Sequence, residues 1–259
     1  MKRIESRDNK WIKRLNGLKI KKNRDKEGLF IAEGLRFIRE IPKNWEVLAY
    51  AVSDAFAAEN DLSPYEEKAE VLCLTDALFA AVCDTENPQG ILAVCKKLDW
   101  DADAVLAKKT PFLLLAEELN DPGNLGTVIR TAHAGGADGL ILSKGSVDLY
   151  NPKVLRSTMG SIFRIPVIQN ADLENVSELM KKSGIKIYAA HLKGKKLPYD
   201  LDLKKGCAFM LGNEARGLSD KAAGLCDELV KIPMPGKAES LNASVAAAVL
   251  IYETVRQRL

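Results

Sequence analysis

The sequence has few residues of the types that form disulfide frameworks and metal centres. It holds five cysteines in 259 residues (Cys73, Cys83, Cys95, Cys207 and Cys226), and none of them has CxxC spacing. An odd set of cysteines, mostly among apolar neighbours, is typical of reduced core thiols in a cytoplasmic protein. We therefore expect no disulfides, no metal site and a cytoplasmic location.

Long hydrophobic runs are absent as well. No apolar stretch approaches the roughly 18 residues that a membrane-spanning helix needs, so we expect no contact with a membrane. The N-terminus, MKRIESRDNKW, lacks the apolar centre of a secretory signal. With 47% hydrophobic and 28% charged residues, the composition is that of a globular protein with one or two domains.

Several catalytic fingerprints are also missing. The sequence contains no GxGxxG, GxxxxGK[ST], HExxH or GxSxG motif, which argues against dinucleotide-binding, P-loop, zinc-protease and serine-hydrolase sites. The only histidines are His133 and His191. We interpret both as surface or packing residues and not as catalysts.

Charge is present but unevenly distributed. The net charge is +3, yet residues 1–27 hold eleven basic and four acidic side chains, a local net charge of +7. Such clustering predicts contact with a phosphate backbone, although a solvated helix face is the alternative. The RNA-contacting residues that we predict are Lys21, Lys22, Arg24, Lys26 and, further along, Arg156. Residues 51–90 hold nine acids and one lysine, so this flank should face away from RNA.

Alternating short helices and strands fill the first hundred residues. Apolar positions from Trp11 to Leu18 follow a helical period, and the segment from 18 to 28 is interpreted as a polar loop. Strands are expected at residues 29–31, 47–52, 71–74 and 90–95, and helices at residues 33–40 and 75–82. This order predicts a small α/β domain at residues 1–98, followed by a linker at residues 99–110.

The pattern changes at Pro111. PFLLLAEEL is nearly continuous in apolar residues, as in a parallel strand covered on both faces. Helices and apolar strands then alternate, which predicts a doubly wound α/β domain at residues 111–259. A helix should begin at Asn124 as its N-cap. Ligands of such sheets bind beyond the carboxyl ends of the strands, here in the loops after Leu115 and Leu211.

Three segments carry the functional signal. They are NDPGNLGTVIRTAHAGGADGLIL from Asn120, MLGNEARGL from Met210 and IPMPGKAESLNASVAAAVLIYE from Ile232. Their order and content resemble the three motifs of the SPOUT superfamily, in particular the SpoU/TrmH-type RNA ribose 2'-O-methyltransferases. FIAEG and NPQGILAV in the first hundred residues resemble, less specifically, the RNA substrate-binding domain that precedes many of these enzymes.

The resemblance implies an α/β fold with a deep trefoil knot in the C-terminal domain, bound S-adenosylmethionine (SAM) and a homodimer. It also implies methylation of a ribose 2'-hydroxyl of RNA, with rRNA favoured over tRNA by the N-terminal extension. The catalytic residues that it implies are Asn124, Arg130, Glu214, Ser240 and Asn242. Its cofactor-binding residues would be Gly212, Ile232, Met234, Gly236 and Leu241, with no metal ion.

Arg130 is the residue to which we give the central chemical role. It lies six residues after Asn124 and should project near the same crevice. A guanidinium has a pKa of about 12.5 or higher, so we expect it to orient the ribose-phosphate and to stabilise the developing oxyanion, not to act as a base.

Three functions are alternatives to an rRNA ribose methyltransferase. They are a tRNA ribose methyltransferase, a related enzyme that modifies a base, and a non-enzymatic RNA-binding protein on the same fold.

Overall fold

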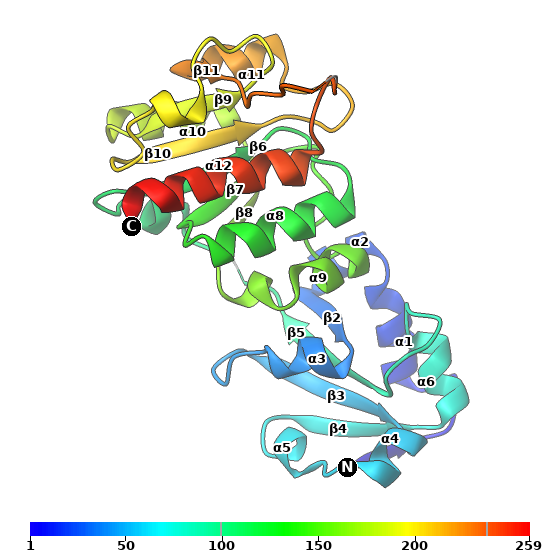
Figure 1. The fold of residues 1–259 in the computed structure, drawn as a ribbon. Coiled ribbons are helices and arrows are strands. Elements are labelled where there is room, and N and C mark those ends of the chain that lie inside the picture. Colours follow the sequence, from blue (N-terminus) through cyan, green and yellow to red (C-terminus); the bar gives the residue numbers. More distant parts are fainter. Residues whose placement is uncertain (99, 237) are drawn as a thin grey trace. The chain divides into compact units, whose positions relative to one another are not determined.

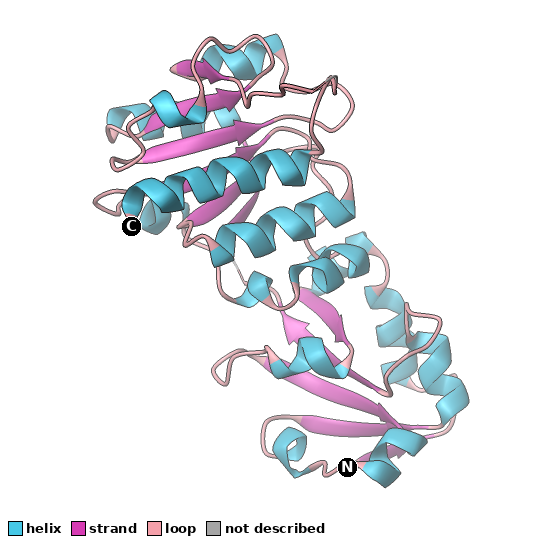
Figure 2. Cartoon of the chain, viewed as in Figure 1, coloured by secondary structure: helices cyan, strands magenta, loops and turns pink. Residues whose placement is uncertain are grey.

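The computed structural model describes residues 1–98, 100–236 and 238–259 (Figure 1). The first residue of the expected linker, Asp99, and Lys237 of the third motif therefore lie outside the described residues. The chain forms two compact units: one comprises Met1–Leu98 and Tyr150–Phe163, the other Asp99–Leu149 and Arg164–Leu259. Both combine helices with a sheet (Figure 2), as the sequence predicted.

The first unit is built on a mixed five-stranded sheet with the order β1-β4-β3-β5-β2. Its strands are β1 (Lys2–Ile4), β2 (Leu29–Glu33), β3 (Val47–Ser53), β4 (Glu70–Leu74) and β5 (Ile91–Lys96). The sequence patterns predicted all of these strands except β1. That strand is three residues long with two exposed positions, so it has too little apolar pattern to be recognised.

The helices of this unit pack against the sheet. They are α1 (Lys10–Leu18), α2 (Lys21–Glu27), α3 (Leu35–Arg39), α4 (Asp54–Glu59), α5 (Ser63–Glu66), α6 (Asp76–Val82) and α9 (Pro152–Thr158), with a 3-10 turn η1 (Ser161–Phe163). The interpretation of residues 18–28 as a loop was wrong, because α2 lies there. Its sequence KKNRDKE has no apolar stripe, and the helix is held by an Arg24 guanidinium that donates to the carbonyls of Leu18 and Lys19 at 2.8 and 2.7 Å.

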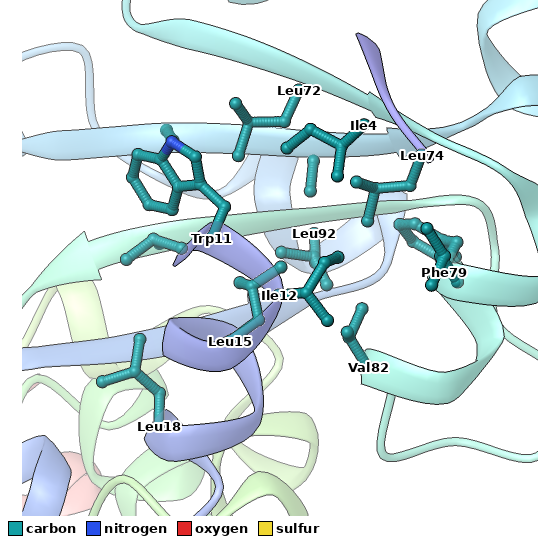
Figure 3. Packing of buried hydrophobic residues seen from close by; sticks show 14 of the residues in the cluster. Ile4, Trp11, Ile12, Leu15, Leu18, Leu72, Leu74, Phe79, Val82 and Leu92 are labelled. Carbon is teal, nitrogen blue, oxygen red and sulfur yellow. The ribbon is translucent and has the colours of Figure 1, made fainter. Parts of the chain in front are cut away.

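The apolar stripe of α1 forms one side of the core of this unit. Trp11, Ile12, Leu15 and Leu18 are all buried and pack with sheet residues and with α6 (Figure 3). The sheet and α6 contribute Leu72, Leu74, Leu92, Phe79 and Val82 to this cluster. The helical period read from the sequence is therefore confirmed, and its apolar face is the one that packs on the sheet.

Residues 150–163 come from the middle of the sequence but belong to the first unit. Phe163 packs edge-on against Trp45, with ring centroids 4.7 Å apart, and lies 5.3 Å from Phe37. Tyr150 lies 4.7 Å from Phe30. These aromatic contacts pack the two ends of segment 150–163 against side chains of residues 1–98, although the sequence led us to expect it within the 111–259 domain.

The second unit is built on a six-stranded sheet with the order β11-β9-β10-β6-β7-β8, in which every neighbouring pair is parallel. Its strands are β6 (Phe112–Ala116), β7 (Gly139–Ser143), β8 (Val167–Ala171), β9 (Lys186–Ala190), β10 (Cys207–Leu211) and β11 (Glu228–Val230). All five residues of β6 are buried, so the prediction of a strand covered on both faces is confirmed. The strand order reverses beside β6, which is where such sheets bind ligands.

Helices cover both faces of this sheet. They are α7 (Ala102–Leu106), α8 (Pro122–Ala134), α10 (Leu173–Lys182), α11 (Asp220–Leu225) and α12 (Ala243–Arg258), with a 3-10 turn η2 (Pro198–Asp200). The helices α8 and α12 lie side by side on one face (Figure 1). On the other face, Met180 of α10 and Ala222 of α11 join the core cluster of the sheet. The resemblance assigns the trefoil knot that it implies to this part of the chain.

Candidate functional site

A cavity of about 310 Å³ opens at the carboxyl ends of three neighbouring strands, β9, β10 and β11. The loops that follow these strands form its walls, and the start of α12 closes one side. Its lining includes Ala190, His191, Leu192, Gly212, Asn213, Glu214, Val230, Ile232, Met234, Glu239, Ser240, Leu241 and Ala243. The second sequence motif, which ends at Leu218, and the third, which begins at Ile232, therefore meet around one space.

The wall after β10 is a closed turn that only glycine permits at its first position. A Cβ on Gly212 would lie 2.2 Å from the carbonyl carbon of Gly217 and 2.2 Å from the amide nitrogen of Leu218. The turn is closed by backbone hydrogen bonds of 3.1 and 2.8 Å between Asn213 and Gly217. The Asn213 side chain then accepts from the N–H of Ala215 at 3.0 Å, which fixes the segment that carries Glu214.

Three of the expected catalytic residues meet in one hydrogen-bond network. The Asn242 amide donates to Oδ1 of Asn124 at 2.9 Å, and the Asn124 amide donates to Oε1 of Glu214 at 3.2 Å. Each of these side chains comes from a different motif. The network therefore ties the start of α8, the loop after β10 and the start of α12 together at one edge of the cavity.

The helix starts explain how these side chains are aimed. Asn242 caps α12, because its Oδ1 accepts from the N–H groups of Ser244 and Val245 at 2.9 and 3.4 Å. The N-cap of α8 is Asp121, which accepts from the N–H of Asn124 at 2.7 Å, so the prediction of Asn124 as that cap was wrong. Because Asn124 lies inside the first turn, its side chain is free to bridge Glu214 and Asn242.

The Glu214 carboxyl is held in its ionised form. Partial burial by itself raises its pKa, but the N–H groups of Asp121 and Asn120 donate to it at 2.8 and 3.1 Å, and the Asn124 amide adds a further hydrogen bond. Together these donors outweigh burial, and the pKa of Glu214 is lowered from its ordinary value. Glu214 is therefore an acceptor at neutral pH that anchors the N-terminal turn of α8.

Glu214→Gln tests this anchoring role through pH. Since the folded-state pKa lies below the ordinary value of 4.5, the carboxylate stabilises the fold above that value, and the contribution is lost as the pH falls through the lowered folded-state pKa. We expect the wild type to have the higher thermal midpoint at neutral pH, and the difference from Glu214→Gln to shrink on acidification. Thermal scans across the acid range measure it; a difference that is independent of pH would contradict the role.

Arg130 is not among the residues that line the cavity. It lies on α8 with an exposed side chain, and within the described ranges of the chain it forms no ion pair. Six residues separate it from Asn124, which places it about 9 Å along the helix and on a different face. The expectation that both residues project into one crevice of the same chain is therefore not met.

The expected cofactor residues gather more closely. Gly212, Ile232, Met234 and Leu241 all line the cavity, together with the catalytic candidates Glu214 and Ser240. Gly236 is exposed and does not line it. The structure adds His191, which the sequence had led us to interpret as a surface or packing residue. His191 directly follows β9, so the rule that ligands bind at strand ends could have identified it.

SAM fits the chemistry of this cavity. Ile232, Met234 and Leu241 offer apolar contact to a flat heterocycle, and the carboxylates of Glu214 and Glu239 are complementary to a positively charged ligand. Gly212 has no side chain to fill the space where the turn borders the cavity. Within residues 1–98, 100–236 and 238–259, no cluster of three His, Cys, Asp or Glu side chains could hold a metal ion.

The residues expected to contact RNA differ in their availability. Lys22 and Lys26 are exposed on α2, whereas Lys21 forms an ion pair with Asp25 at 2.7 Å. Arg24 was wrongly predicted, because it is only 5% exposed and its guanidinium donates to backbone carbonyls. Arg156 is exposed and pairs with Asp84 at 2.8 Å.

Among the described helices, none has the length and hydrophobicity needed to cross a membrane.

Two family models match the chain. The model of the SpoU rRNA Methylase family covers residues 111–252, and that of an MRM3-like substrate binding domain covers residues 9–93. These matches agree with the resemblances of the C-terminal motifs and of the first hundred residues.

Individual relatives extend over nearly the whole chain. The 23S rRNA (guanosine(2553)-2'-O)-methyltransferase RlmP of Bacillus subtilis is 36% identical over 97% of this chain and 98% of its own length. The 23S rRNA (uridine(2479)-2'-O)-methyltransferase of Streptomyces viridochromogenes is 30% identical over 100% and 93%.

Among solved structures, an AdoMet-bound rRNA methyltransferase from Sinorhizobium meliloti is 29% identical, with a TM-score of 0.88 over 100% of this chain and 98% of that chain. The AdoMet complex of AviRb from Streptomyces viridochromogenes is 30% identical, with a TM-score of 0.85 over 96% and 98%. The motifs, the fold, the family models and these relatives agree, and the chain belongs to the SpoU rRNA methylase family of SAM-dependent RNA 2'-O-methyltransferases.

Proposed function

We propose that this protein transfers the methyl group of SAM to a ribose 2'-hydroxyl of rRNA. The observation that carries the proposal is the network of Asn124, Glu214 and Asn242, which joins all three motifs at the edge of the cavity. A purely structural RNA-binding protein would not need that polar arrangement beside a cavity suited to SAM. The rRNA target is supported by the names of the relatives and by the substrate-binding domain match.

SAM, when bound, supplies an activated methyl group, and the chain must hold the acceptor hydroxyl in line with it. We assign the cofactor contacts to Gly212, Ile232, Met234 and Leu241, the expected cofactor residues that line the cavity. The hydrogen bonds of Asn124, Glu214 and Asn242 fix the loops that border both ligands and reduce the reorganisation needed on binding. Ser240 lines the cavity beside them. We assign Arg130 to the ribose-phosphate of the acceptor, where a guanidinium stabilises the negative charge that develops on the 2'-oxygen.

The domain roles follow the same proposal. Residues 1–98 would recruit RNA, residues 99–110 would connect, and residues 111–259 would perform methyl transfer in the cytoplasm. A tRNA target is the second candidate for the substrate. One similar solved structure concerns the 2-OH methylation of C/U34 on tRNA. That match covers only 57% of this chain.

A homodimer is part of the proposal, and α12 supplies its surface. Val245, Val249 and Tyr252 lie on one face of this helix at spacings of four and three residues. They are 48%, 37% and 54% exposed, which is high for apolar side chains of a long helix. A second copy that packs on this stripe would shield it through a two-fold interface.

Val249→Asp is expected to convert the dimer to a 28.4 kDa monomer, because it would place a charge in the shielded stripe. Leu179→Asp is the matched control, since Leu179 is 47% exposed on α10, outside the stripe. Sedimentation equilibrium at micromolar concentration distinguishes the two masses. A wild type that sediments as one chain would argue against the dimer.

Transfer of radioactive methyl from SAM to rRNA or tRNA transcripts tests the activity itself. Nucleoside analysis of the product by mass spectrometry distinguishes a 2'-O-methyl ribose from a methylated base. We expect label in rRNA, on ribose. Label on a base would indicate a base methyltransferase, and label only in tRNA would indicate a tRNA enzyme. Binding of RNA without any methyl transfer would favour a non-enzymatic RNA-binding protein.

A further inference from the structure

A second cavity, in the first unit, has no role in methyl transfer as described above. Its volume is about 510 Å³, within the range of small-molecule sites. Arginines, side-chain amides and two apolar side chains line it. The lining residues are Glu33, Gly34, Arg36, Phe37, Arg39, Glu40, Thr85, Asn87, Gln89, Arg156 and Met159.

Hydrogen bonds hold one wall of this cavity in place. The Glu33 carboxylate accepts from the N–H groups of Asp84 and Thr85 at 2.8 and 3.3 Å and from the Thr85 hydroxyl. The carbonyl oxygen of the Gln89 side chain accepts from the N–H of Leu35 at 2.8 Å. Because that oxygen is engaged, the Gln89 –NH₂ group retains both of its donors for a ligand.

Three arginines line the cavity, and Arg36 and Arg39 are two of them. They are three residues apart on α3, so they lie on the same side of the helix. Both side chains are exposed, and neither forms an ion pair with any residue in the described part of the chain. The carboxylates of Glu33 and Glu40 line the same cavity, and the Glu33 carboxylate already accepts three donors. The third arginine of the lining, Arg156, pairs with Asp84 at 2.8 Å, so Arg36 and Arg39 are the lining cations that form no ion pair within the described residues.

Apolar surface lies beside these charges. Met159 is 49% exposed and has a left-handed backbone with φ 48°, which turns the chain at the end of α9. The next residue, Gly160, packs so closely that an added Cβ would lie 2.3 Å from Cβ of Glu40. This contact fixes Met159 at the cavity, where its thioether and Phe37 offer a surface on which a planar ring can pack.

We propose that this cavity binds an unpaired nucleotide of the RNA substrate, with Arg36 and Arg39 on its phosphates, the Gln89 and Asn87 amides on the base edge, and Met159 against the base. The proposal rests on the proposed function for the presence of an RNA substrate. Guanidinium forks match phosphate geometry, and proteins that read RNA do so mainly at unpaired bases that are stacked and hydrogen-bonded.

This site explains RNA recruitment better than the basic segment that the sequence singled out. In that segment Arg24 is buried, Lys21 pairs with Asp25, and Arg14 pairs with Glu27 at 2.6 Å. The charges of Arg36 and Arg39 are not neutralised in this way. A patch of lysines alone would also bind a duplex, whereas a cavity with amides and an apolar side chain selects a nucleotide that is not stacked in a helix.

The test compares Arg36→Ala/Arg39→Ala with Lys43→Ala/Lys96→Ala. The control removes the same charge from exposed positions of the same unit that do not line the cavity. The probe is a fluorescent 12-nucleotide single-stranded RNA of mixed sequence, with a duplex of equal length beside it. We expect the arginine variant to bind the single strand at least about tenfold more weakly and to lower the slope of log affinity against log salt by about 1.4, since each phosphate contact contributes about 0.7.

Gln89→Glu keeps the oxygen that accepts from Leu35 but removes both amide donors, and it is also expected to weaken single-strand binding. Crosslinking of a 4-thiouridine-substituted strand to the wild type is expected to label peptides that contain residues 36–39 or 156–159. Unchanged affinity and salt slope in the arginine variant, or crosslinks confined to other peptides, would overturn the site. If the variant does not fold, the wild-type crosslinks decide.

Methyl transfer separates this proposal from the proposed function. If the wild type binds single-stranded RNA but transfers no methyl group, and the arginine variant loses that binding, the nucleotide site is supported and the enzymatic function is refuted. Full methylation at low RNA concentration by the arginine variant would refute the nucleotide site and leave the enzymatic function standing.

Discussion

Arg130→Ala is expected to reduce methyl transfer by about 100-fold or more while leaving SAM affinity nearly unchanged. Removal of one group that stabilises developing charge in a transition state typically has an effect of this size. SAM affinity should persist because Arg130 does not line the cofactor cavity and forms no ion pair within the described residues that its loss would break. Arg130→Lys should also be poor, since an ammonium cannot present the planar guanidinium fork.

Arg256→Ala is the control for Arg130→Ala. Arg256 is an exposed arginine of the same unit whose pair with Glu253 lies at the surface, where ion pairs contribute little. Single-turnover methylation with saturating SAM measures the chemical step, and calorimetry measures SAM binding. Retained turnover in Arg130→Ala would remove Arg130 from the active site. A parallel loss of SAM affinity would instead place it in the cofactor site.

Gly212→Ala is expected to abolish SAM binding and to destabilise the fold by about 3 kcal/mol. The added methyl would lie 2.2 Å from backbone atoms of Gly217 and Leu218, and backbone cannot move aside as the end of a flexible side chain can. The turn must therefore open, which displaces Glu214 and the cavity wall after β10. Thermal scans and SAM calorimetry follow the two effects separately.

Gly224→Ala is the matched control for this substitution. Gly224 lies in α11, and a Cβ added there would have no atom within 4 Å outside its own helix turn, so alanine should stabilise that helix by about 0.5–1 kcal/mol. The same chemical change is thus expected to have opposite signs at two positions of one unit. A Gly212→Ala variant with wild-type stability and SAM affinity would show that the turn relaxes, and that closure at Gly212 is not required.

The sequence by itself determined the elements whose signal is local. The unbroken apolar run of β6 and the helical stripe of α1 were both recognisable, because burial periodicity acts over a few neighbouring residues. The three motifs also identified the family, and six of the site residues named from them line the cavity: Gly212, Glu214, Ile232, Met234, Ser240 and Leu241. Their pattern determines which side chains are available, but it does not determine where those side chains lie relative to one another.

Tertiary structure alone decided those relations. Asn124 bridges Glu214 and Asn242 over sequence separations of 90 and 118 residues, and segment 150–163 joins the aromatic cluster of the first unit. Arg24 reads as a surface cation in the sequence but is buried, because the carbonyls at the end of α1 need donors and its guanidinium is within reach. Each outcome depends on the approach of chain segments that are distant in sequence or follow a turn. Local propensity carries no information about such contacts, and they form only when the two elements pack.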